Sequence, residues 1–185
     1  MIRPRPWAGW TLALTLLAPA SRPAFASHAQ HPPEAAEFSC PGTARFSPHG
    51  GAEALVVDTL AQARVSVRIA IYGLTSRKIE QTLLSLAQAG VRVSIKADHL
   101  QSAGKTQAAL LARLRAAGIE VEVSRVGRLL HDKFAVIDGR WVVTGSFNWT
   151  EGAEGRNREN ILAFDCPALA SAFEAEWETI RPDDP

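Results

Sequence analysis

The sequence predicts an α/β fold with a mixed, largely parallel β-sheet and helices packed on both faces. Strand-like apolar runs alternate with helix-like segments between residues 52 and 123, a pattern typical of parallel strands joined by helical crossovers. Asp138-Gly139 separates two further apolar runs, as in a tight hairpin of antiparallel strands. A chain of 185 residues is long enough for one well-formed core and too short for two.

In the first part of the chain, strands are predicted where branched residues cluster, and helices where apolar side chains recur at every third or fourth position. In chain order, the elements are a strand over 43–46, a helix over 52–63, a strand over 65–72, a helix over 76–88, a strand over 91–96, a helix over 105–117 and a strand over 119–123. Ser76 can cap the second helix, and Gly90 and Gly118 follow the second and third helices. The repeated strand–helix order predicts the parallel part of the sheet.

The second part of the chain predicts a hairpin, one more strand and a closing helix. In chain order, the elements are strands over 134–137, 141–144 and 161–164 and a helix over 167–180. The first of these strands is rich in branched and aromatic residues and is expected to be buried. The three strands should extend the sheet in mixed directions.

Polar residues around the hairpin have a spacing that suits chemistry on an anion. His131 and Lys133 are two positions apart at the start of a strand, so their side chains point to the same face. An imidazole beside an ammonium group, with no acid between them on that face, favours a negatively charged ligand. Ser146 and Asn148 follow the return strand and can donate hydrogen bonds, and Glu159 precedes the last strand.

This spacing resembles the HKD motif of the phospholipase D superfamily. The matching residues are, in order, His131, Lys133, Asp138, Gly145, Ser146 and Asn148. Glu159-Asn160 at the head of a strand is also similar to that family, and the resemblance extends from about residue 44 to residue 177. It is closest to the small bacterial members that carry one motif per chain and act as endonucleases, and it implies the phospholipase D-like fold.

The resemblance implies a role for each polar residue. His131 would attack phosphorus to give a covalent phosphohistidine. A second histidine would protonate the leaving oxygen and then activate water. Lys133 and Asn148 would hold the phosphate oxygens and stabilise the charge that develops there. Glu159 and Ser146 would form hydrogen bonds around the imidazole and present its reactive nitrogen.

Two motif residues are expected to support the geometry. Asp138 lies at the opposite strand parity from His131, so we expect it to hold the hairpin and not to touch substrate; Gly145 is the small residue at the strand end. Taken singly, a histidine beside a strand, a Gly-Ser pair and an Asp-Gly turn are each more often structural. Taken together at this spacing, they favour catalysis.

The chemistry needs two histidines, whereas the chain carries one motif. No other histidine has the same lysine, serine and asparagine context. A homodimer that brings two copies of His131 to one site shared across the two-fold axis is the simplest solution, and the resemblance also implies it.

The N-terminal segment predicts export. Arg3 and Arg5 precede an apolar stretch, and Ala24-Phe25-Ala26 is a small-residue cleavage site, so residues 1–26 are predicted to be a signal peptide. An uncleaved anchor is the alternative, although the apolar run is short for a membrane span. Residues 27–42 are predicted to be a flexible leader and 43–185 a single catalytic domain. The protein would be periplasmic or secreted.

Charge gives only local support for a nucleic-acid partner. Residues 1–26 contain three of the 20 basic residues and none of the 19 acidic ones, so the chain without them has a net charge of −2 with histidine neutral. Arg125 and Arg128 precede His131, and Arg156 and Arg158 precede Glu159. These arginines can attract a phosphate backbone or can be ordinary solvated loop charges.

Two cysteines, Cys40 and Cys166, lie near opposite ends of the predicted mature chain. In an exported protein such a pair suggests a disulfide, although both can be free thiols. The sequence contains no cluster with metal-ligand spacing, and the implied mechanism supplies its own nucleophile and positive charge, so no metal and no cofactor are expected. Asp98 and His99 follow a strand, and their side chains diverge if that strand continues. They are interpreted as loop residues, which can lie near the substrate groove.

Three functions are compatible with a fold of this kind. An endonuclease cutting DNA or RNA is favoured by the short chain with one motif and by the arginines; Phe147 and Trp149 can stack on bases or can be core residues. A phospholipase D acting on phospholipid head groups is the alternative, but the sequence shows no clear apolar surface segment beyond residues 1–26. A non-catalytic binding protein ranks last because every motif position is filled.

Overall fold

A computed structural model describes residues 37–124, 126–127 and 129–180. The predicted signal peptide over 1–26 and most of the predicted leader lie outside these residues, as do Arg125 and Arg128. In the described part of the chain, no helix has both the length and the apolar character that a membrane span requires.

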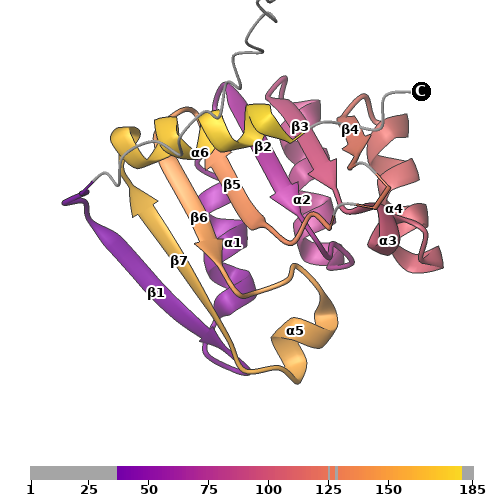
Figure 1. Ribbon diagram of the computed structural model, residues 1–185, viewed down its shortest axis with the longest axis horizontal. Coiled ribbons are helices and arrows are strands. Elements are labelled where there is room, and N and C mark those ends of the chain that lie inside the picture. The colour runs from indigo at the N-terminus through magenta and orange to yellow at the C-terminus, as the bar shows by residue number, and fades with distance from the viewer. Residues whose placement is uncertain (1–36, 125, 128, 181–185) are drawn as a thin grey trace, which may run out of the picture. The chain divides into compact units, whose positions relative to one another are not determined.

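The described strands form one mixed sheet (Figure 1). Across the sheet, the order is β1 (Gly42–Ser47), β7 (Glu159–Asp165), β6 (Trp141–Gly145), β5 (Lys133–Ile137), β2 (Ser66–Ile71), β3 (Arg92–Ala97) and β4 (Glu120–Val123). Strands β2, β3 and β4 are parallel, and the other neighbouring pairs are antiparallel.

The predicted mixed α/β sheet is confirmed, with a correction to its balance. Parallel pairing was expected to dominate, but it is limited to β2, β3 and β4. Helix α2 joins β2 to β3 and α4 lies between β3 and β4, as the crossovers between parallel neighbours require. A tight turn joins β5 to β6, and the connection that contains α5 joins β6 to β7; both pairs are antiparallel. Strand β1 closes the far edge of the sheet against β7.

Helices cover both faces of the sheet, as predicted. On one face lie α1 (Ala52–Leu60), α2 (Arg77–Gln88) and α4 (Lys105–Ala116), and on the other lies α6 (Pro167–Thr179) (Figure 1). Alternation along β5 divides the core accordingly: Ala135 and Ile137 join the cluster of the three helices, whereas Phe134 and Val136 join that of α6.

Two short helices were not predicted: α3 (His99–Ser102) and α5 (Glu151–Gly155). Each is about one turn long, which is too short to show a helical period in the sequence. Their caps fix them instead, because the side chain of Asp98 accepts from the N–H of Gln101, and that of Thr150 accepts from the N–H of Ala153.

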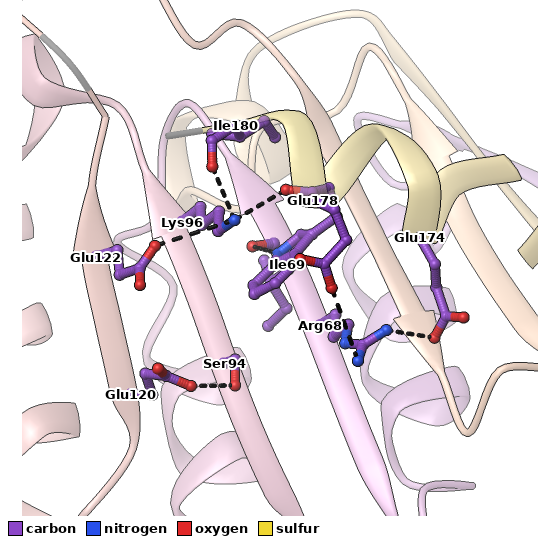
Figure 2. Close-up of polar contacts among 10 residues, drawn as sticks. Arg68, Ile69, Ser94, Lys96, Glu120, Glu122, Glu174, Glu178 and Ile180 are labelled. Atoms are coloured by element: carbon purple, nitrogen blue, oxygen red, sulfur yellow. Dashed lines mark hydrogen bonds and ion pairs between the residues drawn. The ribbon is translucent and has the colours of Figure 1, made fainter. Parts of the chain in front are cut away.

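The end of α6 is anchored by Lys96 of β3 (Figure 2). The buried ammonium group donates to the carbonyl oxygens of Trp177 at 2.9 Å and Ile180 at 2.8 Å, where a helix end carries partial negative charge. The same nitrogen lies 3.6 Å from the centroid of the Trp177 ring.

A groove of about 790 Å³ is lined by residues of β2, β3 and β4 and by the end of α6. None of the motif residues lines this groove.

A disulfide joins Cys40, just before β1, to Cys166 at the start of α6. It closes a long stretch of sequence, because the two cysteines are 126 positions apart. The bond therefore fastens the edge strand β1 to the start of α6, which packs on β2, β5 and β6.

Candidate active site

The motif residues meet at one edge of the sheet because of the strand directions. Strand β5 begins at Lys133, the antiparallel β6 ends at Gly145, and β7 begins at Glu159. The register pairs Phe134 with Thr144, and Gly145 with Ile161. The start of β5, the end of β6 and the start of β7 thus lie side by side, with His131, Ser146 and Glu159 at that edge.

His131 and Lys133 differ in their exposure. The His131 side chain is exposed, whereas Lys133 is only 7% exposed and donates from Nζ to the carbonyl oxygen of His131 at 2.6 Å. Burial lowers the pKa of Lys133, and the carboxylates of Asp132, Glu159 and Asp98 oppose that shift. A buried cation with a lowered pKa beside an exposed imidazole is suited to a phosphate group.

Ser146 and Glu159 are directly bonded. The Ser146 hydroxyl donates to Glu159 Oε2 at 2.6 Å, and the side-chain amide of Asn157 donates to Glu159 Oε1 at 3.0 Å. The backbone N–H of Asn160 donates in turn to Ser146 Oγ at 3.1 Å. Both carboxylate oxygens are therefore held within one chain, by partners other than His131. That Glu159 orients the imidazole stays a prediction, and the sequence analysis missed Asn157.

Asn148 packs against the end of β2. A Cβ atom added to Gly73 would lie 3.3 Å from Asn148 Oδ1, so Gly73 leaves the room that this amide occupies. Within the described residues, Oδ1 is buried and has no hydrogen-bond partner. An unpaired buried amide oxygen costs free energy unless a water or another donor pairs with it. Contact with phosphate oxygens would come from the NH₂ group of Asn148, which is the donor of this amide.

Asp138 lies at the end of β5 opposite to Lys133. Its carboxylate accepts hydrogen bonds from the backbone N–H groups of Arg64, Val65 and Ser66 at 2.8 to 2.9 Å, which ties the hairpin to the start of β2. Burial acts to raise the pKa of Asp138, but these hydrogen bonds outweigh it and lower the pKa. Asp138 therefore has a structural role, at the end of β5 that lies away from His131, Ser146 and Glu159.

Gly145 is required by close packing of β6 on β7. A Cβ atom at this position would lie 2.3 Å from the backbone oxygen of Asn160, so any larger residue would push the strands apart. The shift would fall directly beside Ser146 and Glu159.

Two aromatic residues near the motif belong to the core. Phe147 and Trp149 are both completely buried, so the suggestion that they stack on bases is wrong and the core interpretation is right. Arg156 and Arg158 are exposed in the connection that leads to Glu159.

Two further residues lie near the motif: Tyr72, which was not predicted from the sequence, and Asp98, which was predicted to be a loop residue with a place near the substrate groove. Tyr72, which follows β2, has its ring centroid 4.7 Å from that of His131. Asp98, which follows β3, is completely buried and caps α3, so it is not simply a loop residue; its Oδ2 lies 3.7 Å from His99 Nδ1. Both stand at the carboxyl ends of parallel strands, where α/β sheets place their ligands, and that rule could have found them.

Three apolar side chains near the motif are exposed. They are Leu100, Val126 and Leu129, which are 59%, 69% and 54% exposed. Leu100 belongs to α3, and the other two precede His131. Hydrogen bonds join their segments, because the N–H of His99 donates to Ser124 Oγ and that of Leu130 donates to Asp98 Oδ2. The sequence did not single out these three exposed apolar side chains.

A metal centre is not evident in the described ranges. Residues 37–124, 126–127 and 129–180 contain no group of three or more His, Cys, Asp or Glu side chains arranged to hold a metal ion.

The fold and the site together define a phospholipase D-like domain. A family model described as "Cardiolipin synthase, PLD-like domain" matches residues 56–181. The chain therefore belongs to the phospholipase D superfamily.

Relatives of different names share this domain. The chain is 35% identical over 124 residues to a mitochondrial cardiolipin hydrolase of Chlamydomonas reinhardtii, covering 67% of this chain and 55% of the relative. It is 33% identical over 132 residues to a phospholipase D of Rickettsia bellii, covering 71% and 65%. The solved structure of Nuc from Salmonella typhimurium, a phospholipase D family member, matches with a TM-score of 0.74 and 29% identity, covering 80% of this chain and 100% of Nuc.

Proposed function

We propose that this protein is a metal-independent phosphodiesterase that acts as an endonuclease on DNA or RNA. The observation that carries the proposal is the meeting of His131, Lys133 and the bonded pair Ser146–Glu159 at one sheet edge. The nucleic-acid assignment rests on the resemblance to small single-motif endonucleases, on the likeness to Nuc along its full length, and on the exposed Arg156 and Arg158.

The reaction proceeds in two displacements. The reactive nitrogen of His131 attacks phosphorus, a P–N bond forms, and the P–O bond to the leaving group breaks. A second imidazole gives its proton to the leaving oxygen and then takes a proton from water, which attacks phosphorus and releases His131. Lys133 and Asn148 bind the non-bridging oxygens, where negative charge increases in each transition state.

The second imidazole comes from a second copy of the chain. His131 is exposed at the motif edge, and two-fold symmetry can place two such edges face to face. The proposed enzyme is therefore a homodimer with one shared site.

Export is proposed together with this function. The disulfide between Cys40 and Cys166 is typical of oxidising compartments such as the periplasm or the external medium. Sequencing the N-terminus of protein recovered from the periplasm or the medium tests the proposal. A mature chain that begins at Ser27 is the expected result, and recovery of the full chain from the cell interior would contradict it.

A phospholipase D activity is the second candidate, and exposed apolar side chains favour it. Val126 and Leu129 are exposed on the segment that leads to His131, and Leu100 is exposed on α3, which is bonded to that segment. Exposed apolar side chains of this kind are suited to contact with a lipid surface. The names of the cardiolipin hydrolase and phospholipase D relatives point in the same direction.

One experiment separates these possibilities. The purified protein is incubated in excess EDTA with supercoiled plasmid and, separately, with cardiolipin vesicles, beside His131→Ala and a control, His49→Asn, at an exposed histidine outside the motif. Plasmid nicking by the wild type and the control, but not by His131→Ala, is expected. Cleavage of lipid alone would replace the nuclease assignment, and cleavage of neither substrate would contradict both candidates.

A further inference from the structure

The ring of Tyr72 lies close to both His131 and Lys133, the two motif residues to which phosphate chemistry is assigned. Its ring centroid is 4.7 Å from that of His131, with the planes tilted by 59°, and Lys133 Nζ lies 5.1 Å from the same centroid. The backbone N–H of Tyr72 donates to the carbonyl oxygen of Asp132 at 2.9 Å. The end of β2 is thus bonded to the segment that carries both His131 and Lys133.

The tyrosine ring is itself held by α3. The side-chain amide of Gln101 donates to the Tyr72 hydroxyl at 2.9 Å. Gln107 of α4 donates to the Tyr72 carbonyl oxygen at 3.3 Å and accepts from the N–H of Leu74 at 2.7 Å. Backbone and phenol are therefore fixed at separate points, which leaves the ring little freedom to turn.

A second support runs from α3 to the His131 segment. Asp98 is completely buried, and its two carboxylate oxygens accept from the N–H groups of Gln101 and Leu130 at 3.0 and 3.1 Å. Leu130 immediately precedes His131. The turn Asp98–Gln101 is therefore connected to His131 twice, through the backbone of Leu130 and through the ring of Tyr72.

We infer that Tyr72 is a positioning residue for His131, held in place by Gln101; this inference rests on the proposed nucleophilic role of His131. An exposed imidazole has free rotamers, and each unproductive one lowers the fraction of molecules ready to attack. Within one chain, both oxygens of Glu159 are bonded to Ser146 and Asn157. The aromatic contact then restricts the imidazole, and the same ring faces the ammonium group of Lys133.

Isotope labelling tests the contact without any assay of activity. Tyr72 is the only tyrosine in the chain, so tyrosine labelled with ¹³C at Cζ gives a single NMR signal. The ring of His131 lies close enough to Tyr72 to contribute to this shift. We therefore expect the signal of His131→Asn to differ from that of the wild type, and the signal of the control His49→Asn to match it. A signal that is the same in His131→Asn and the wild type would overturn the inference.

Substitutions test the consequence for catalysis. With phosphodiester cleavage followed in single turnovers, Tyr72→Leu should slow the chemical step by about 100-fold, the scale expected for a misplaced reacting group, with little change in KM. Tyr72→Phe keeps the ring and loses only its hydrogen bond with Gln101, so its rate should lie between those of Tyr72→Leu and the wild type. A defect of folding would lower the amplitude of the turnover and not its rate, so a normal rate in Tyr72→Leu would contradict positioning.

Gln101 is tested by a double-mutant cycle. Tyr72→Phe and Gln101→Leu each break the same hydrogen bond, so the double variant should be no slower than the slower single variant. Gln62→Leu, which removes a surface amide bonded to Asp58, serves as the control and should have the wild-type rate. Additive effects would show that Gln101 acts independently of Tyr72. If neither the wild type nor any variant cleaves a phosphodiester, the proposed function fails, and the NMR comparison of the wild type with His131→Asn still decides the contact between Tyr72 and His131.

Discussion

At the scale of the residue, two ionisable groups of the motif owe their properties to opposite causes. Lys133 is buried with few partners, so loss of hydration dominates and its pKa falls. Asp138 receives three backbone hydrogen bonds, which outweigh the effect of burial and lower its pKa. Lys133 is therefore suited to bind an anion, whereas the carboxylate of Asp138 stabilises the hairpin.

The pKa of Lys133 predicts an alkaline limit to activity. Only the ammonium form stabilises phosphate charge, so activity should fall as pH rises through a pKa below the ordinary lysine value of 10.5. The pH profile of kcat/KM checks this. Lys133→Gln should lower activity by about 100- to 1000-fold and abolish that limb of the profile. If the fall in kcat/KM at high pH were unchanged in Lys133→Gln, that fall would come from the titration of another group.

Asp138 predicts stability that depends on pH. Its folded pKa is lower than the ordinary value of 3.8, so its stabilisation is complete above that value and is lost as pH falls through the folded pKa. Asp138→Asn should lower the free energy of unfolding by about 1–3 kcal/mol at pH 7. Urea titrations at several pH values should show that the difference in stability begins to shrink below pH 3.8 and decreases further as pH falls through the lower folded pKa. A difference independent of pH would contradict the role of the charge.

At the scale of the element, the antiparallel half of the sheet carries the motif and the parallel half supports it. Strands β5, β6 and β7 bring His131, Ser146 and Glu159 together, whereas the ends of β2 and β3 supply Tyr72 and Asp98. The sequence predicted His131, Ser146 and Glu159, because strand alternation and a hairpin turn can be recognised from residues that are neighbours in the sequence. The placing of Tyr72 and Asp98 depends on β2 lying beside β5, and that order is decided by packing across the whole sheet.

The disulfide gives a prediction for the outer elements. Because it closes a long loop, it restricts the unfolded chain, and Cys40→Ser with Cys166→Ser should lower the free energy of unfolding by about 2–4 kcal/mol. Urea denaturation of the variant beside the oxidised wild type measures this. The variant should be insensitive to reductant, and an equally insensitive wild type would show that the bond does not contribute.

At the scale of the whole molecule, one chain provides half of the proposed chemistry. A single imidazole cannot be both the nucleophile bonded to phosphorus and the acid that protonates the leaving oxygen. The described fold places one His131 at an exposed sheet edge, which leaves it accessible to a second copy. Oligomeric state and activity should therefore be linked.

Mixing experiments test this link. Wild-type chains are unfolded and refolded together with His131→Ala chains in varied proportions. If each site needs two histidines, activity should decrease with the square of the wild-type fraction, because only dimers of two wild-type chains are competent. A linear decrease would mean that each chain works alone. Refolded mixtures of wild type and His49→Asn, which keep His131, should retain full activity.

The pairing of β1 with β7 has a consequence for the order in which the protein is built. β1 is synthesised before the other described strands, yet its hydrogen-bonding partner follows more than a hundred residues later. Until then it has no neighbour within the sheet, since β2 pairs with β3 and β5. Long-range closures of this kind are slow. Although β1 is synthesised before the other described strands, it is thus among the last of them to pair within the sheet. The disulfide between Cys40 and Cys166 can form only when both cysteines have been synthesised and lie side by side.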